Sequence, residues 1–145
     1  MTVFFSKKCE IGIQAVLFLS TRSSGELFNA TEIAEHTKTP KEFIAKILQG
    51  LTPSGIVGSK KGKNGGFFLA KMPSEIKIID IVAQIDGLES FSTCVLGFPG
   101  CSAEKPCPVH ESWGKIREQA YQMLSSQTLE NLRIASNEKI NSIKN

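Results

Sequence analysis

The chain has 145 residues, 41% of them hydrophobic, and a net charge of +3. A chain of this size buries enough surface to hold an ordinary core, and its composition excludes disorder as the state of the whole chain. Its longest uninterrupted apolar run, Ala15 to Leu19, is too short to cross a membrane. Its first apolar residues precede its first charges, the reverse of a secretory signal. We therefore expect a cytoplasmic protein with no membrane partner.

The excess positive charge lies in the first half of the chain. Residues 1–70 contain nine Lys or Arg and five Asp or Glu, whereas residues 71–145 contain eight and nine. The first half is therefore the half expected to bind an anionic partner.

Two helices are expected before residue 37. Apolar residues at helical spacing predict the first from about Lys8 to Thr21. Asn29 followed by Glu32 forms a capping-box pattern, which opens a short second helix that ends near His36.

A third, amphipathic helix follows a tight turn. Thr39 precedes Pro40, which we place at the first helical position, where its missing N–H has no cost. The apolar stripe of this helix consists of Phe43, Ile44, Ile47, Leu48 and Leu51. A short helix, a turn and an amphipathic helix indicate a helix-turn-helix. The residues expected in or beside the DNA major groove are Thr39, Lys41, Glu42 and Lys46.

A basic hairpin is predicted next. Two short β-prone runs between residues 56 and 69 flank a glycine-rich turn that contains Asn64-Gly65, a hairpin signal. In an isolated hairpin, Lys60, Lys61 and Lys63 would simply be solvated. After a recognition-type helix they predict a wing that reaches phosphates or the minor groove. A nucleotide phosphate loop is disfavoured, because no Gly-Lys-Ser/Thr follows and no helix begins there.

The second half is expected to contain two helices separated by a long loop. Residues 74–85 predict a helix closed by Asp86-Gly87, and no periodicity follows until about Pro108. Loops this long in compact domains are functional or disordered. The last helix is predicted from about His110 to Ser125, with an apolar stripe made of Trp113, Ile116, Ala120 and Met123 or Leu124. We interpret this stripe as a dimerisation surface in preference to packing within the chain.

The long loop contains three of the four cysteines. Cys94, Cys101, Cys107 and His110 have the spacing C-x6-C-x5-C-x2-H. Thiolates suit zinc, copper(I) and iron–sulfur clusters, and the intervening glycines and prolines allow a loop to bend around a metal. A lone cysteine is ordinarily a small buried hydrophobe. Structural zinc sites usually use close Cys-x2-Cys pairs, which this spacing lacks, so the pattern favours a cluster.

The chain resembles the Rrf2 family of bacterial transcription regulators over about residues 3–134. The resemblance lies in Ile13-Gln-Ala-Val-Leu-Phe-Leu, Phe43-Ile-Ala-Lys-Ile-Leu-Gln-Gly-Leu, Gly55-Ile-Val, Lys61-Gly-Lys-Asn-Gly-Gly-Phe-Phe-Leu-Ala, Cys107-Pro-Val-His-Glu-Ser-Trp and Thr128-Leu-Glu-Asn-Leu. It implies a homodimeric winged-helix regulator of double-stranded DNA, with an iron–sulfur cluster held by the three loop cysteines. A redox or nitric-oxide signal, or iron status, would control DNA binding.

The resemblance also bears on the fourth ligand. In IscR-like members, a histidine separated by two residues from the third cysteine completes a 2Fe–2S site, and His110 occupies that position. In NsrR-like members, an acidic residue of the other subunit's first helix plays that role, and Glu10 stands there. We favour His110 with 2Fe–2S over Glu10 with 4Fe–4S. Two departures are a first cysteine gap of six residues, where five is usual, and Ala45 where a base-reading glutamate can stand.

The expected architecture is mainly α with a small β wing. Its expected parts are a winged helix-turn-helix domain at 1–86, a cluster loop at 87–110, a dimerisation helix with a short terminal segment at 111–135 and a polar tail at 136–145. We predict a DNA-binding regulator, a repressor in preference to an activator, and not an enzyme. The rivals are a zinc-stabilised or thiol-only winged-helix protein and a thiol enzyme with His110 as its base. No small-molecule substrate is expected.

Overall fold

The computed structural model describes residues 5–22 and 25–135, so the expected polar tail at 136–145 lies outside the described residues. Its helices and strands are α1 (Lys7–Ser20), α2 (Ala30–Thr37), α3 (Lys41–Gly50), β1 (Val57–Lys60), β2 (Gly66–Leu69), η1 (Pro73–Glu75), α4 (Ile78–Ile85), η2 (Glu89–Phe91) and α5 (His110–Ser126). Residues 129–135 form a further helical segment. Among these described elements, none is both long and apolar enough to cross a membrane.

Helices α2 and α3 form the predicted helix-turn-helix. The Asn29 side chain accepts a hydrogen bond from the backbone N–H of Glu32 at 2.9 Å and thereby caps the start of α2. Lys38 ends α2 in the left-handed conformation, with φ of 55°. The position expected for Pro40 is wrong by one residue, because Pro40 is the N-cap of α3 and the helix begins at Lys41.

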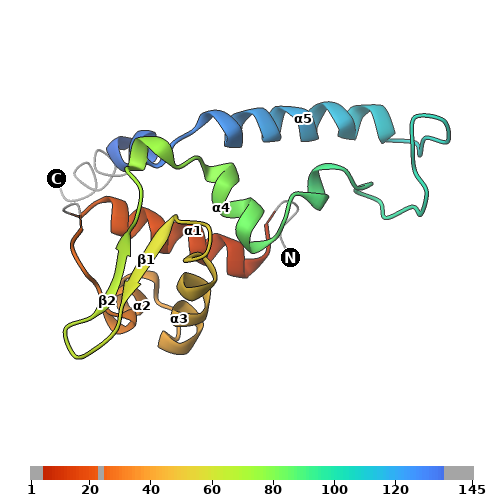
Figure 1. The fold of residues 1–145 in the computed structure, drawn as a ribbon. Helices are drawn as coiled ribbons and strands as arrows, with labels where there is room; N and C mark the ends of the chain where they lie inside the picture. The colour runs from red at the N-terminus through yellow and green to blue at the C-terminus, as the bar shows by residue number, and fades with distance from the viewer. Residues whose placement is uncertain (1–4, 23–24, 136–145) are drawn as a thin grey trace.

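The hairpin is antiparallel and packs onto the helices. Val57 pairs with Leu69 and Lys60 with Gly66, which leaves a turn of residues 61–65. Phe67 forms a bridge to Phe28, just before α2, and its side chain joins the core. Figure 1 shows the hairpin turn at the same end of the molecule as α2 and α3, away from α5.

The single helix expected at 74–85 is wrong, because the chain is interrupted at residues 76 and 77. Ile76 is extended, with φ of −110° and ψ of 119°, and separates the 3₁₀ turn η1 from α4. The extended residues pair with the segment after α5: the carbonyl of Ile76 accepts the N–H of Leu129 at 2.9 Å. Lys77 forms a bridge to Thr128. A long-range pairing therefore overrides the local helical pattern.

Helix α1 lies at the centre of the core. Its residues Ala15, Val16 and Leu19 belong to a buried cluster with α2, α3 and the hairpin. Cys9, on another face, belongs to a second cluster with α4 and α5. At Gly12, α1 packs closely on Ile85 of α4: a Cβ at this position would lie 2.4 Å from Ile85 Cδ1.

The apolar stripe predicted on α5 is divided between two faces. Leu124 is 4% exposed and packs against α4, so the expectation that the stripe has no partner within the chain is wrong for this residue. Tyr121 packs edge-on to Phe91, with ring centroids 5.6 Å apart. In contrast, Ile116 and Met123 are 53% and 51% exposed. One face of α5 is therefore held by its own chain, and another remains exposed.

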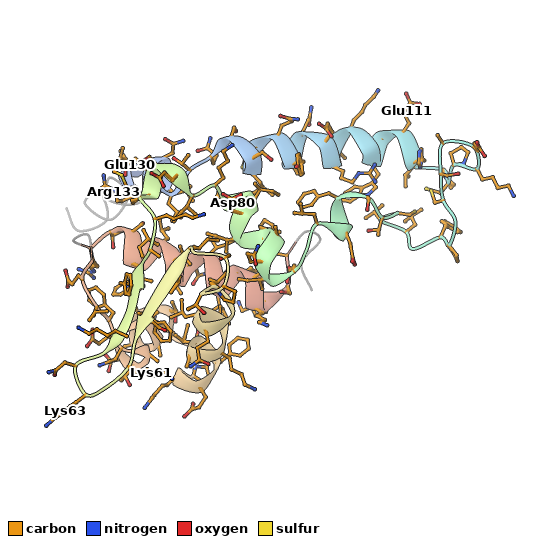
Figure 2. All side chains as sticks on the ribbon, in the orientation of Figure 1. Lys61, Lys63, Asp80, Glu111, Glu130 and Arg133 are labelled. Carbon is orange, nitrogen blue, oxygen red and sulfur yellow. The ribbon has the colours of Figure 1, made fainter. Side chains whose placement is uncertain are left out.

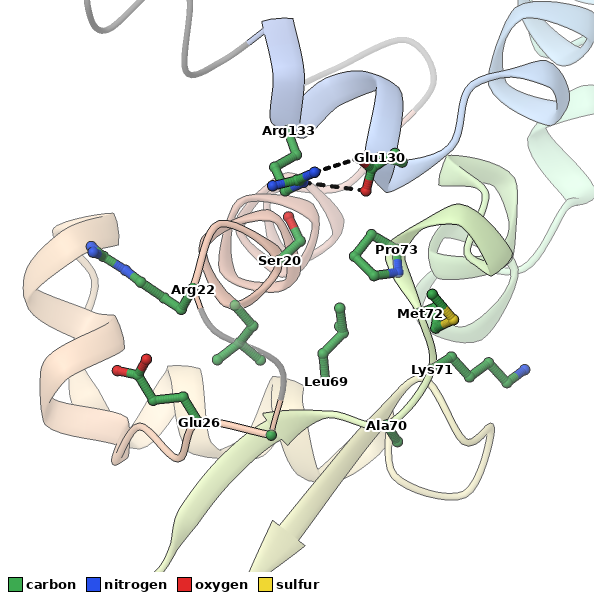
Figure 3. A pocket seen from close by; sticks show the side chains of 12 residues that line it. Ser20, Arg22, Glu26, Leu69, Ala70, Lys71, Met72, Pro73, Glu130 and Arg133 are labelled. Carbon is green, nitrogen blue, oxygen red and sulfur yellow. Dashed lines mark hydrogen bonds and ion pairs between the residues drawn. The ribbon is translucent and has the colours of Figure 1, made fainter.

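The segment after α5 returns to the end of α1. Arg133 and Glu130 form an ion pair above a cleft of about 330 Å³ between this segment, α1 and the end of β2 (Figure 3). Arg22 and Lys71 point away from the centre of the cleft in opposite directions. These two cationic side chains therefore do not converge on its centre.

We predict that docking of this segment depends on Leu129, whose side chain is fully buried in the main core. Leu129→Ala should lower the free energy of unfolding by about 2–5 kcal/mol, because it leaves a cavity. Urea denaturation measures this change. Ile134→Ala, at a position 49% exposed in the same segment, is the matched control and should cost less than about 0.5 kcal/mol. Equal effects of the two changes would contradict the docking.

Candidate metal centre and nucleic-acid interface

The loop between η2 and α5 is shaped by two glycine turns. The N–H of Gly97 bonds to the carbonyl of Cys94 at 3.1 Å, and the N–H of Cys101 to that of Phe98 at 3.4 Å. Gly97 and Gly100 have φ of 77° and 71°, a region that residues with a Cβ rarely adopt. The turns fold the chain back so that its cysteines meet.

The three loop cysteines form a compact sulfur group. The Sγ atoms of Cys94, Cys101 and Cys107 all lie within 4.8 Å of one another, and each side chain is half-buried. The sulfurs of Cys94 and Cys107 lie 3.5 Å apart. Three converging thiols are the donor set expected for zinc or an iron–sulfur cluster, so the side chains fit the predicted type of cofactor.

The two candidates for a fourth ligand differ in position. His110, the first residue of α5, places Nδ1 3.3 Å from the Sγ of Cys101. Glu10 lies in the first turn of α1, where its carboxylate pairs with Lys7 at 3.5 Å. Among the described residues, the group of ligand atoms within 4.8 Å of one another holds the three cysteines alone, without His110 and without a carboxylate, and His110 contacts only Cys101 of the three at hydrogen-bond distance. Within one chain, His110 is therefore the nearer candidate.

The cysteines differ in acidity. Hydrogen bonds from the backbone N–H of Phe98 and then of Leu96 hold the pKa of the Cys94 thiol well below its ordinary value, at about 7. Loss of hydration raises the pKa of Cys107. Cys9 is fully buried in α1, and burial, followed by the charge of Asp86, raises its pKa to about 12. Cys94 therefore forms a thiolate more readily than Cys107, and Cys9 is chemically protected.

A further contact to this loop was not expected from the sequence. Trp113 Nε1 donates to the carbonyl of Thr93 at 3.0 Å, and Arg117 Nη1 lies 3.5 Å from the same oxygen. The helical spacing predicts Trp113 on a partner-facing stripe. An available signal was its indole N–H, which needs an acceptor when the ring is partly buried.

The predicted DNA-contacting residues lie on one end of the molecule. On α3, Lys41, Glu42 and Lys46 are exposed, while Ile44, Ile47 and Leu48 face the core. Thr39 is half-buried, and its hydroxyl donates to the carbonyl of Thr37 at 3.1 Å. Lys60, Lys61 and Lys63 are all exposed at the hairpin end.

Glycines determine the shape of this hairpin. A Cβ at Gly65 would lie 2.0 Å from the carbonyl oxygen of Lys60, and one at Gly66 would lie 2.6 Å from that of Phe28. Backbone atoms cannot move aside as a flexible side chain can. These glycines therefore allow the turn to close and β2 to approach the residues before α2.

Charge is distributed unequally along the molecule. Figure 2 shows Lys61 and Lys63 at the end of the hairpin farthest from α5. The labelled acidic residues Asp80, Glu111 and Glu130 lie on the side of α4 and α5. This separation places the basic excess predicted from the sequence at the helix-turn-helix end, where a polyanion would be attracted.

Comparisons with known proteins agree with this arrangement. The sequence profile of the Rrf2 family, described as "Iron-dependent Transcriptional regulator", matches residues 5–133. A relative from Aquifex aeolicus, described as a putative HTH-type transcriptional regulator, is 33% identical over 132 residues, which are 90% of this chain and 91% of the relative.

Two solved structures show the same fold. The structure of CymR, described as the global cysteine regulator of B. subtilis, has a TM-score of 0.77 and 23% identity, and the match covers 90% of this chain and 96% of CymR. The IscR structure from T. potens has a TM-score of 0.73 and 26% identity, and the match covers 93% of this chain and 89% of IscR. The expected winged-helix architecture is confirmed.

We predict that alkylation of the reduced, metal-free protein follows the order of thiol acidity. Because a lowered pKa leaves more thiolate at a given pH, Cys94 should react with iodoacetamide with a midpoint near pH 7. Cys107 should need a higher pH, and Cys9 should react only after unfolding. Peptide mass spectrometry measures each site. Labelling of Cys107 ahead of Cys94 at neutral pH would contradict this order.

Proposed function

This chain belongs to the Rrf2 family of iron-dependent transcriptional regulators, and from that premise we propose that it is a homodimeric DNA-binding repressor controlled by an iron–sulfur cluster. In this proposal, the cluster is bound by Cys94, Cys101 and Cys107, and His110 is the fourth ligand. Oxidation, nitric oxide or iron shortage alters or removes the cluster and thereby changes affinity for the operator.

The observation that carries the proposal is the convergence of three cysteine sulfurs within 4.8 Å, on a loop that leads into α5. Three half-buried thiols that converge on a glycine-shaped loop form a donor set suited to one shared metal or cluster. The same chain holds a helix-turn-helix with an exposed basic hairpin, which supports joining a metal-sensing role to a DNA-binding role in one protein.

Each part of the chain has a distinct task in this proposal. The three thiolates and the His110 imidazole hold iron, and a cluster supplies reversible redox chemistry and sensitivity to oxidants. The exposed face of α5, with Ile116 and Met123, forms the dimer contact and sets the spacing of two recognition helices. The residues assigned to DNA are Thr39, Lys41, Glu42, Lys46, Lys60, Lys61 and Lys63.

His110 is favoured over Glu10 as the fourth ligand because its Nδ1 lies 3.3 Å from the Cys101 sulfur in the same chain. A neutral nitrogen ligand raises the potential of a 2Fe–2S centre, which suits a sensor that must respond to oxidation. Completion by Glu10 requires a second subunit, and we associate that arrangement with a 4Fe–4S cluster.

The second candidate is a zinc-stabilised or thiol-only regulator with the same DNA-binding domain. It is favoured by the donor set itself, since three cysteines and one histidine also match a structural zinc site. Anaerobic purification distinguishes the two candidates. A brown protein containing iron and sulfide supports the cluster, whereas a colourless protein with one zinc, or with no metal, refutes it.

We predict that His110→Ala weakens the cluster without abolishing its assembly. Loss of one ligand should accelerate cluster release to a chelator by at least about tenfold, because the exposed iron takes water. Absorption under anaerobic conditions follows the release. Glu10→Ala should leave the rate unchanged, and each change of Cys94, Cys101 or Cys107 to Ala should prevent stable assembly. A wild-type rate for His110→Ala together with loss in Glu10→Ala would reverse the assignment.

We predict that Lys61→Ala weakens operator binding by removing one phosphate contact. The slope of log affinity against log salt concentration should fall by about one unit. Fluorescence anisotropy over a salt series gives both quantities. Lys115→Ala, which removes an exposed α5 lysine paired with Glu111, is the control and should change neither. An unaltered slope in Lys61→Ala would exclude this lysine from the interface.

A further inference from the structure

Along one face of α5, successive side chains contact first the cysteine loop and then Phe91 of η2. His110 lies beside Cys101, and Tyr121 packs on Phe91. Between them, Trp113 and Arg117 both reach the carbonyl of Thr93. These residues are three or four positions apart and therefore share a face of the helix. The face contacts the loop immediately before its first cysteine.

The Thr93 carbonyl is a defined attachment point. A carbonyl oxygen has two lone pairs, and here two donors approach it, at 3.0 Å from Trp113 Nε1 and 3.5 Å from Arg117 Nη1. The Thr93 residue is otherwise exposed, and Trp113 is half-buried. The backbone is therefore held at this point by side chains of α5 and not by a helix or strand of its own.

Thr93 lies at the start of the cysteine loop, so its contact with α5 affects the whole loop. Cys94 follows directly, whereas Cys107 lies three residues before the start of α5, with the N–H of His110 bonded to its carbonyl at 3.1 Å. One end of the cysteine loop is thus joined covalently to α5, and the other end is held to α5 through Thr93. Holding both ends reduces the entropy that metal binding would otherwise have to overcome.

We propose that Trp113 and Arg117 are positioning residues that hold the Thr93 carbonyl and thereby keep the Cys94 sulfur beside those of Cys101 and Cys107 before a metal binds. This inference deepens the proposed function, since it concerns the same metal centre. Neither side chain is a metal ligand. Their role is to order the loop, so their loss weakens metal binding while the fold remains.

The test uses Co(II) alone as the probe, because Co(II) needs the thiolates but no sulfide. Reduced, metal-free protein is titrated anaerobically and the thiolate-to-cobalt absorption is measured. Trp113→Phe removes the indole N–H but keeps an aromatic ring, and should weaken Co(II) binding about fivefold, the loss expected for one hydrogen bond. Arg117→Met keeps the aliphatic stem and should weaken it about twofold, in line with its longer contact.

Tyr121→Phe is the matched control. It lies on the same face of α5, keeps its ring contact with Phe91 and changes one polar atom, so its Co(II) affinity should equal that of the wild type. Thermal midpoints of all variants should agree, which separates positioning from general stability. Wild-type affinity in Trp113→Phe overturns the proposal, as does a wild type that binds no Co(II). If Trp113→Phe does not fold, wild-type affinity in Arg117→Met overturns it.

A second measurement needs no metal. The chain contains one tryptophan, so the ¹⁵N–¹H spectrum has a single indole N–H signal. Its hydrogen exchange should be at least about tenfold slower than in the urea-unfolded chain, and equal exchange overturns the proposal. Failure of the cluster proposal can be told apart from failure of this one. A protein that purifies without iron and sulfide, but gives the expected Co(II) affinities and indole exchange, rejects the cluster and retains the positioning role.

Discussion

The packing of α1 between α3 on one side and α4 on the other is the constraint on which the rest of the structure depends. The two buried clusters meet on this helix, and the Ile85 side chain of α4 packs beside Gly12, where a Cβ would lie 2.4 Å from Ile85 Cδ1. The N-terminus of α1 is joined to the C-terminus of α4 as well, because the backbone N–H of Ser6 donates to Asp86 at 2.7 Å. Helix α3 and the start of the cysteine loop are thus both attached to α1.

The candidate DNA-binding surface and the cysteine loop therefore lie on opposite sides of a shared frame. The basic wing and α3 lie at one end, while the sulfur group lies on a loop that begins after Asp86 and ends at α5 (Figure 1). Residues 127–129 pair with residues 76–78 and return the chain to the winged-helix core after α5. The loop and α3 are therefore linked through packed elements, with α4 and α1 between them.

Local signals account for most of the fold. Capping at Asn29, the stripe on α3 and the glycine-rich basic turn each follow from interactions within a few residues, and the helix-turn-helix and hairpin appear where those patterns predict them. The break at Ile76 could not be found in this way. The apolar residues from 76 to 82 fit a helix, and only pairing with Leu129, more than fifty residues later, makes the extended conformation favourable.

The sequence by itself determined which side chains are available to the candidate site: three cysteines on a glycine- and proline-rich loop and a histidine where the next helix begins, in a chain whose helix-turn-helix half is basic. Ligand type depends on residue identity, and a glycine turn needs no distant partner, so both can be read from the chain. Only the tertiary structure decided which face of α5 meets the domain, because Trp113 and Ile116 are both apolar and three residues apart. The acceptor for Trp113 is a backbone carbonyl at Thr93, and backbone carbonyls are present at every residue. The sequence therefore contains no mark that distinguishes this carbonyl, and folding alone places it against α5.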